Sequence, residues 1–474
     1  MPNSSTMQEV LDRQRAAFTA ARPEPVSVRR DRLERLIALS RERGEALAKA
    51  MSADFGHRSV QQSMLTDIGP GVTAAKYCLK HLSAWTRPER RSVPFPLGLL
   101  GAKAEIRHEA KGVVGIVSPW NFPVGLTVGP LAQALAAGNR AMIKPSEFTE
   151  RTSEAMAEAF AAFFAEDEIA VVLGGPDVGQ AFCKLAFDHL LFTGATSIGR
   201  HVLHAAADNL VPVTLELGGK SPTILGRGAD LKRAGERIAL GKMMNAGQIC
   251  LAPDYLLVPQ ERENEAIEGV RQGVAAMYPT LLSNEDYAAV INARHRDRLK
   301  ELIADAVEKG AEAIEVNPGG EDFSAANLNK MPLTILRNVD DGMKVMQEEI
   351  FGPILPVKTY KGIDQAIDYV NAHDRPLGLY YFGDDRSERE SVLTRTISGG
   401  VTINDVLFHV GIEDLPFGGI GPSGMGSYHG PEGFKTFSHA RSIYTQPRID
   451  VAKLAGLRPP FGKAADRAVA MQMK

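Results

Sequence analysis

The sequence predicts an α/β protein built from a doubly wound parallel sheet, a second α/β unit and a small β element. The first observation is length, because 474 residues are enough for two or three domains of ordinary size. The second is an alternation, from Gly112 onward, of short apolar runs with amphipathic helical patterns. The third is composition, because 44% hydrophobic and 23% charged residues are typical of a globular protein with a large core.

Before this alternation the chain is predicted to be helical. Leucines recur at helical spacing from Ser27 to Met51, which predicts an amphipathic helix. A second helix is predicted from Val60 to Trp85, with a break or kink near Gly69-Pro70-Gly71. A connection rich in proline and glycine follows, and Ala102 to Glu109 then alternates like an exposed strand.

The apolar runs after Gly112 predict the strands of the first sheet. These runs are Val113–Val117, Arg140–Ile143, Ile169–Leu173 and His189–Phe192. The helical patterns that follow them are Leu131–Ala137, Thr152–Phe164, Val178–Ala186 and Ile198–Ala207. Sheets of this kind bind ligands at the carboxyl ends of their strands. The polar or small residues expected at those ends are Asn121, Lys144, Glu147, Gly194 and Glu216.

A second stretch of mixed strands and helices extends from Gly219 to about Pro416, so we place a domain boundary near Gly218-Gly219. Its first part contains a predicted helix from Ile238 to Met244 and a predicted strand from Tyr255 to Val258. Phe437 to Tyr444 is predicted to be a terminal strand.

Charge and cysteine content exclude several classes of function. The net charge of -3 gives no general attraction to nucleic acid or to an anionic membrane. Three cysteines are an odd number in a long chain, which favours a reducing compartment and predicts a cytoplasmic protein. Met1 to Arg13 is too polar for a secretory signal, and no run of 18 apolar residues could span a membrane. The eleven histidines show no metal-binding spacing, so no metal is predicted.

Cys250 and Glu216 are the candidate catalytic pair. Cys250 lies in a glycine-containing loop, Asn245 to Cys250, between a predicted helix and a predicted strand. Glu216 precedes Leu217-Gly218-Gly219-Lys220. A thiol can form a thioester with a carbonyl substrate, and a carboxylate can activate the water that hydrolyses it. A lone cysteine is more often a small buried hydrophobic residue, so the pair alone leaves both interpretations open.

Three further motifs each allow a functional and a structural interpretation. Gly194-Ala195-Thr196-Ser197-Ile198-Gly199 could bring backbone N–H groups to a pyrophosphate or form a simple strand–helix turn. Lys144-Pro145-Ser146-Glu147 could contact ribose hydroxyls or place Ser146 as a helix cap. Asn121 lies between Pro119 and Pro123, where it could stabilise an oxyanion or occupy a turn.

Taken together, these motifs resemble those of the NAD(P)-dependent aldehyde dehydrogenase superfamily, from about Lys111 to His439. The segment from Leu415 to Gly430, with Asn404-Asp405-Val406 before it and Phe437-Ser438-His439 after it, is similar to the class 3 branch. Details at Glu413 to Pro416 and at Gly430 to Phe434 are most similar to bacterial coniferyl aldehyde dehydrogenases.

The resemblance implies a role for each motif residue. It implies Cys250 as nucleophile, Asn121 and the Cys250 N–H as oxyanion donors, and Glu216 as the base for hydrolysis. The implied binding residues for NAD or NADP are Lys144 and Glu147 at the adenosine ribose, Gly194 and Gly199 at the pyrophosphate, and Glu349 and Phe351 at the nicotinamide ribose and ring. The family usually has a hydroxyl residue where this chain has Ala195, so a looser pyrophosphate is expected.

The implied organisation has three parts: a dinucleotide-binding domain at 1–90 and 110–218, a catalytic domain at 219–416, and an oligomerisation arm and tail at 91–109 and 430–447. The implied reaction oxidises an aromatic aldehyde such as coniferaldehyde, or a medium-chain aldehyde, to its carboxylate in a homodimer. Three alternatives are weighed against it: a CoA-acylating dehydrogenase, a cysteine hydrolase without cofactor, and a non-catalytic protein that keeps the fold. The first does not need Glu216 and the second does not need Lys144 or Glu349, whereas the third needs none of the catalytic residues.

Overall fold

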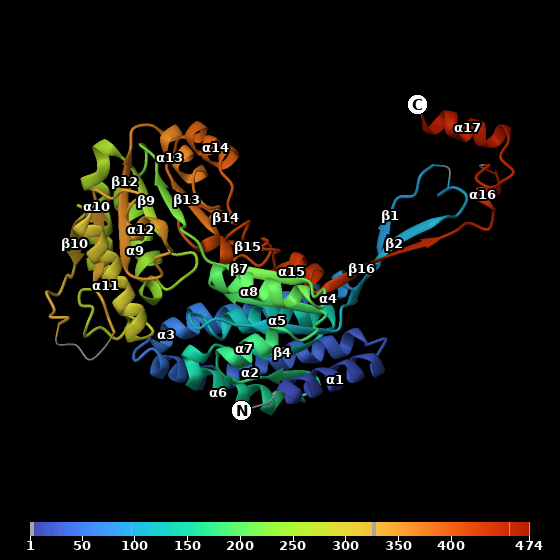
Figure 1. Ribbon diagram of the computed structural model, residues 1–474, viewed down its shortest axis with the longest axis horizontal. Helices are drawn as coiled ribbons and strands as arrows, with labels where there is room; N and C mark the ends of the chain where they lie inside the picture. The colour runs from blue at the N-terminus through green and yellow to red at the C-terminus, as the bar shows by residue number, and fades with distance from the viewer. Residues whose placement is uncertain (1–3, 96, 325–328, 455, 474) are drawn as a thin grey trace.

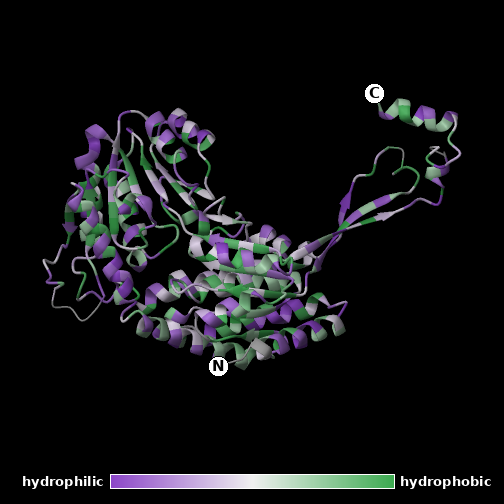
Figure 2. Ribbon diagram, in the orientation of Figure 1, coloured by the Kyte–Doolittle hydropathy of each residue, from purple (hydrophilic) through white to green (hydrophobic). Residues whose placement is uncertain are grey.

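The computed structural model describes residues 4–95, 97–324, 329–454 and 456–473 (Figure 1). Two lobes, each built on a large sheet, lie side by side, and a narrow β arm projects away from them. Apolar residues concentrate in the strands of the two sheets, while the outer faces of the surrounding helices are largely hydrophilic (Figure 2). None of the described helices is long and apolar enough to cross a membrane.

The first sheet has six strands in the order β15-β7-β6-β3-β4-β5. Every neighbouring pair is parallel except β15 with β7. The strands are β3 (Val113–Val117), β4 (Arg140–Lys144), β5 (Ile169–Val171), β6 (His189–Gly194), β7 (Val213–Leu217) and β15 (Gly424–Met425). The predicted parallel sheet is confirmed, and the predicted strands begin at the residues expected of them.

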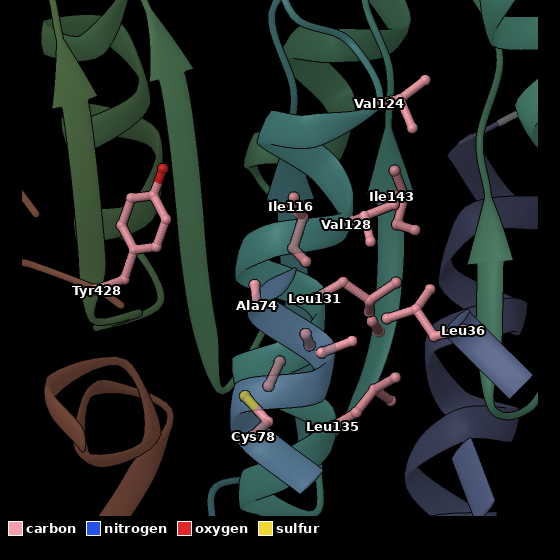
Figure 3. Close-up of a cluster of buried hydrophobic side chains, with 14 of the residues drawn as sticks. Leu36, Ala74, Cys78, Ile116, Val124, Val128, Leu131, Leu135, Ile143 and Tyr428 are labelled. Carbon is pink, nitrogen blue, oxygen red and sulfur yellow. The ribbon is translucent and has the colours of Figure 1, made fainter. Parts of the chain in front are cut away.

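Helices cover both faces of this sheet. One face is covered by α2 (Val26–Asp54), α4 (Gly69–Trp85), α5 (Gly125–Ala137) and α6 (Glu150–Phe163), and the other by α1 (Ser4–Ala20), α7 (Pro176–Cys183) and α8 (Thr196–Ala207). Alternate strand residues point to opposite faces, so Val114 joins the first core and Val113 the second. In the first core, Leu131 and Leu135 of α5 pack close to Cys78 of α4 (Figure 3). Cys78 is therefore a packing residue of this core.

The second sheet has seven strands in the order β10-β11-β12-β9-β8-β13-β14, parallel except for β10. The strands are β8 (Pro222–Leu225), β9 (Tyr255–Pro259), β10 (Glu312–Val316), β11 (Leu333–Arg337), β12 (Ile354–Tyr360), β13 (Gly378–Phe382) and β14 (Gly400–Ile403). Its helices are α9 (Leu231–Met243), α10 (Glu263–Met277), α11 (Ala293–Glu308), α12 (Lys344–Gln347), α13 (Ile363–Asn371) and α14 (Arg386–Arg395). Buried residues of α9 and α10 belong to one core, and those of α11 to α14 to the other.

The arm is a three-stranded antiparallel sheet in the order β1-β2-β16. Its strands are β1 (Glu89–Arg91), β2 (Lys103–Ala110) and β16 (Ser438–Thr445), and α15 (Gly430–Thr436) precedes the last of them. Two short helices, α16 (Val451–Leu454) and α17 (Lys463–Gln472), follow it at the end of the chain. In Figure 1 the arm leaves the lobe of the first sheet, and α17 lies beyond its tip.

The structure departs from the predicted helices in two places. The N-terminal segment forms α1, because Met7, Val10 and Leu11 bury one face of an otherwise polar segment. The predicted break between Val60 and Trp85 is a π turn, Met64–Ile68, which joins α3 (Val60–Ser63) to α4. It ends just before Gly69-Pro70, where a Cβ on Gly69 would lie 2.8 Å from the Met64 carbonyl oxygen.

The proposed division into domains agrees with the change of sheet between β7 and β8, but the boundaries stay a prediction. The predicted ranges include residues 1–3, 96 and 325–328, which lie outside the described residues. The short strand β15 belongs to the first sheet although its residues follow the predicted catalytic range.

Candidate active site

A cavity of about 1160 Å³ lies at the carboxyl ends of the first sheet and is closed by residues of the second lobe. Lys144 and Gly194 are the last residues of β4 and β6, and Glu216 is the penultimate residue of β7. Eight of the nine predicted site residues line the cavity: Asn121, Lys144, Glu147, Gly194, Glu216, Cys250, Glu349 and Phe351.

Gly199 is the exception, because it does not line the cavity. It is buried in α8, where a Cβ would lie 2.7 Å from Leu217 Cδ2. Its lack of a side chain lets α8 pack closely on β7. Gly199 therefore has a packing role, which sets the position of the helix whose start faces the cavity, and its contact with the pyrophosphate stays a prediction.

The loop that carries Cys250 has an unusual backbone. After α9, the φ angles of Asn245, Ala246 and Gly247 are 50°, 52° and 73°, a left-handed run that residues with a Cβ rarely adopt. Gly247 is required for a second reason, because a Cβ there would lie 2.5 Å from the Gly352 carbonyl oxygen.

Gln248 holds this loop in place. Its side-chain Nε2 donates to the carbonyl oxygens of Asn245 (2.8 Å) and Ala289 (3.1 Å), and its Oε1 accepts from the Ile291 N–H (2.9 Å). The side chain is fully buried, so all three bonds are protected from water. The loop therefore presents Cys250 to the cavity in a fixed geometry.

Asn121 is joined directly to the same loop. Its side-chain Nδ2 donates to the Gln248 carbonyl oxygen (3.1 Å), and Asn245 Nδ2 donates to the Asn121 carbonyl oxygen (3.2 Å). An amide nitrogen has two N–H donors. One is used on Gln248, and the other can serve an oxygen atom bound in the cavity.

Glu216 is almost fully buried, and neither of its carboxylate oxygens has a hydrogen-bond partner among the described residues. Burial raises the pKa of Glu216 well above its ordinary value. Burial also raises the pKa of the Cys250 thiol, and the nearby carboxylates of Glu216 and Glu349 raise it further. The resting thiol is therefore neutral at pH 7, and a base must remove its proton before it can attack.

The cavity's other end is lined by Lys144, Glu147 and the start of α8. Lys144 Nζ donates to the Pro145 carbonyl oxygen (2.6 Å), and burial lowers the pKa of Lys144. The Ser146 hydroxyl accepts from the Phe148 N–H (3.2 Å), so the capping interpretation of Ser146 holds. Ala195 precedes α8 and provides no side-chain cap, which leaves the first N–H groups of a 12-residue helix available to an anion.

Glu349 and Phe351 line the cavity nearer Cys250. Glu349 Oε1 is buried without a partner among the described residues, and burial raises the pKa of Glu349 to about 8. A Cβ on Gly218 would overlap this carboxylate, so the glycine is needed there. The ring of Phe351 packs edge-to-face on Trp120, with centroids 5.3 Å apart. A cavity of about 1160 Å³ that is lined by a buried carboxylate with one unpartnered oxygen and by a free helix start fits a dinucleotide.

Sequence reasoning missed several residues around the site. Lys242 is fully buried on α9, its Nζ has no partner among the described residues, and burial lowers its pKa to about 8. Arg58 and Asp67 are fully buried beside Asn121. Cys183 is buried on α7 and also lines the cavity. No motif marks these residues, because their positions depend on contacts between distant segments.

No group of three or more His, Cys, Asp or Glu side chains is placed to hold a metal ion in the part of the chain that the structure describes.

Comparison with known proteins gives one family. The model of the aldehyde dehydrogenase family matches residues 2–443. A probable coniferyl aldehyde dehydrogenase of Caulobacter vibrioides is 54% identical over 100% of this chain and 98% of its own, and a coniferyl aldehyde dehydrogenase of a Pseudomonas species is 50% identical over 96% and 93%. A dimeric NADP-preferring aldehyde dehydrogenase of the dog is 37% identical over 96% and 98%. The solved structure of Staphylococcus aureus AldH in its substrate-bound state has a TM-score of 0.91 and 34% identity, covering 98% of this chain and 99% of that one.

The burial of Glu216 predicts a pH-dependent stability difference for Glu216→Gln. Below about pH 4.5, the ordinary pKa, the carboxyl is protonated in both the folded and unfolded chain. Above it, the unfolded chain is ionised while the folded chain must keep the proton or bury a charge, so the wild type loses stability as pH rises. Glu216→Gln should therefore gain stability over the wild type by up to ~1.4 kcal/mol for each pH unit.

Urea unfolding of both proteins at pH 5 and pH 8 measures this difference. Glu158→Gln is the matched control, because Glu158 is exposed on α6 and should show no such gain. If the free energies of unfolding of Glu216→Gln and the wild type differ by the same amount at both pH values, the inferred effect of burying the Glu216 carboxyl is contradicted.

Proposed function

Because this chain belongs to the aldehyde dehydrogenase family and oxidises an aldehyde with NAD or NADP, we propose that Cys250, Glu216 and Asn121 carry the reaction and that the substrate is an aromatic aldehyde such as coniferaldehyde. The observation that carries the assignment of residues is the cavity. It brings a thiol, a buried carboxylate and an amide donor together from three separate segments of the chain.

Cys250 is the proposed nucleophile. Glu216 removes the thiol proton, and the thiolate sulfur attacks the aldehyde carbon. The substrate oxygen becomes an oxyanion, which accepts hydrogen bonds from the free Asn121 N–H and from the Cys250 backbone N–H. When the cofactor is bound, its nicotinamide ring supplies the acceptor for the hydride that leaves the substrate. The oxidised substrate is left as a thioester on Cys250.

Glu216 passes the thiol proton to solvent and, ionised again, acts a second time. It takes a proton from water, the resulting hydroxide attacks the thioester carbon, and the same two donors stabilise the second oxyanion. The carbon–sulfur bond breaks, the carboxylate product leaves, and Cys250 returns to the thiolate. A carboxyl whose pKa is raised by burial is a stronger base than an exposed one, which suits this task near neutral pH.

The residues along the cavity support the proposed cofactor site. Lys144 and Glu147 would hold the adenosine ribose, and the start of α8 after Gly194 would hold the pyrophosphate. Glu349 would accept hydrogen bonds from the nicotinamide ribose, and Phe351 would pack beside the nicotinamide ring.

Two observations support an aromatic substrate. The two most similar relatives described above are named for coniferyl aldehyde. Phe417 lines the cavity together with Cys250, as do the rings of Trp120 and Phe351. Aromatic rings stack favourably on one another, so this lining suits an aryl aldehyde better than a short aliphatic one. A panel of aldehydes tests this. The formation of NADH or NADPH is followed by absorbance, with NAD and NADP supplied in turn. A higher kcat/KM for acetaldehyde than for coniferaldehyde would contradict it.

A homodimer and a cytoplasmic location are also proposed. The relative from the dog is named dimeric, and β16 is an edge strand of an exposed arm with a largely exposed Tyr444. An open strand edge pairs readily with a second chain. All three cysteines are free thiols, which suits a reducing compartment.

Cys250→Ser should bind the cofactor normally and lose aldehyde oxidation by about 10³-fold or more in kcat, because a serine hydroxyl is a far weaker nucleophile at neutral pH. Steady-state rates and a cofactor-binding titration measure the two effects. Cys78→Ser is the matched control, because Cys78 packs in the core away from the cavity. Near-normal turnover in Cys250→Ser, with loss of turnover in Cys78→Ser, would refute the assignment.

Glu216→Gln keeps the size of the side chain and removes the base. Rapid mixing with aldehyde and NAD should give a burst of NADH followed by a steady rate about 10² to 10⁴ times slower than that of the wild type. The trapped acyl group should appear as added mass on the peptide that contains Cys250. Because Glu216 also deprotonates Cys250, the burst should be slower at low pH and recover as pH rises. Steady turnover at the wild-type rate would remove Glu216 from the mechanism and favour the CoA-acylating alternative.

Light scattering should give a mass of about 102 kDa, twice the 51.2 kDa of one chain. Ser442→Pro, in the middle of β16, should lower this mass toward the monomer because proline disrupts strand pairing. Ala313→Pro in β10, the edge strand of the second sheet, is the control and should leave the dimer intact. A wild-type monomer at micromolar concentration would refute the proposed dimer.

A further inference from the structure

Arg58 and Asp67 form an ion pair that is completely buried beside the active site. Arg58 follows α2, Asp67 lies in the π turn, and their Nη2 and Oδ2 atoms are 3.5 Å apart with both side chains 0% exposed. Burial raises the pKa of Asp67 to about 6, so its carboxylate is ionised at neutral pH beside the guanidinium. Neither residue lines the cavity, so neither touches the reacting atoms.

The pair contacts both ends of the segment that carries the oxyanion donor. Arg58 Nη1 donates to the backbone carbonyl oxygen of Asn121 (2.6 Å), and its guanidinium lies 5.0 Å from the centre of the Phe122 ring. The Asp67 carboxylate accepts from the backbone N–H of Gly125, where α5 begins. A Cβ on Gly125 would lie 2.6 Å from the Asp67 carbonyl oxygen, so the two backbones approach closely.

These contacts are not explained by stability. Removing two charges from water is expensive, and a well-packed apolar pair of the same volume often stabilises a fold as well or better. An apolar pair could not donate to the Asn121 carbonyl or accept from the Gly125 N–H. What the ions provide here is a fixed position for the backbone from Asn121 to Gly125.

We propose that Arg58 and Asp67 are positioning residues for oxyanion stabilisation. They fix the backbone of residues 121–125, and this keeps the Asn121 side chain hydrogen-bonded to the loop that carries Cys250. The proposal rests on the proposed role of Asn121 as oxyanion donor. Asn245 links the two parts, because its Nδ2 donates to the carbonyl oxygens of both Asn121 (3.2 Å) and Gln248 (3.3 Å). The Asn121 carbonyl thus accepts one bond from Arg58 and one from the loop that carries Cys250.

The double variant Arg58→Met/Asp67→Asn tests this without leaving a single buried charge. Its kcat/KM for aldehyde should fall about 10- to 100-fold, because a displacement of a catalytic group by about 1 Å can cost up to 10² in rate. Alkylation of Cys250 by iodoacetamide should proceed at the wild-type rate, because that displacement reaction forms no oxyanion. Cofactor binding should also be unchanged.

A control comes from a second buried ion pair, between Arg32 of α2 and Glu168. Arg32 is 3% exposed, its Nε donates to Glu168 Oε1 (2.9 Å), and neither residue lines the cavity. Arg32→Met/Glu168→Gln also removes a buried ion pair, and it takes a partner from Glu24 and from Arg35 as well, so it is the more disruptive change and should still leave kcat/KM of the folded enzyme near the wild-type value. An equal loss of kcat/KM in the two double variants would overturn the proposal, because it would then reflect general destabilisation.

A double-mutant cycle shows whether the pair acts through Asn121. In the Asn121→Ala background the Arg58→Met/Asp67→Asn changes should have almost no further effect on kcat/KM. Additive losses would overturn the proposal, and so would wild-type kcat/KM in Arg58→Met/Asp67→Asn. If that variant does not fold, the same cycle is run with Arg58→Lys, which keeps the charge and loses the planar donor geometry. If the wild-type protein oxidises no aldehyde, the proposed function itself is refuted.

Discussion

The hydrogen bond from Asn121 Nδ2 to the Gln248 carbonyl oxygen is the contact on which the active site depends. Asn121 follows β3 of the first sheet, and Gln248 belongs to the loop between α9 and β9 of the second lobe. The bond therefore joins the two lobes at the point where the proposed oxyanion donor and the proposed nucleophile meet. Because the loop runs through three left-handed residues, it would relax to another conformation without partners on both sides. Gln248 supplies the partners within the second lobe, and Asn121 supplies the partner from the first.

Local sequence patterns were sufficient to predict the first sheet and most of the cavity lining. Strands such as Val113–Val117 are short apolar runs with a turn after them, and the order of an α/β sheet places the next polar residue at its ligand-binding edge. That rule alone puts Lys144, Gly194 and Glu216 around one cavity. The roles of Glu349 and Phe351 came from family resemblance, since nothing in their neighbourhood indicates a ligand. The positive φ of Phe351, 53°, could not be read from its sequence context.

The residues that sequence reasoning missed share a physical cause. Arg58, Asp67 and Lys242 are charged residues that are completely buried, whereas a charged residue in a polar segment is normally exposed. Their burial depends on partners far away in the chain, such as the Asn121 carbonyl for Arg58. Gly199 is a different case, because its glycine-containing turn predicts a ligand role, while the close packing of α8 on Leu217 is visible only in the structure.

The placement of buried acids explains how one site can serve two chemical steps. Most buried polar atoms in proteins are hydrogen-bonded, yet both oxygens of Glu216 and one of Glu349 have no partner among the described residues. Such groups destabilise the folded chain, and both lie on the wall of the same cavity. Pairing Glu216 with an arginine would remove that cost, but it would also lower the pKa of its carboxyl and weaken it as a base. The proposed base therefore stays strong because no cation pairs with its carboxylate, and the buried Arg58 donates to the Asn121 backbone carbonyl and pairs with Asp67 instead of neutralising Glu216.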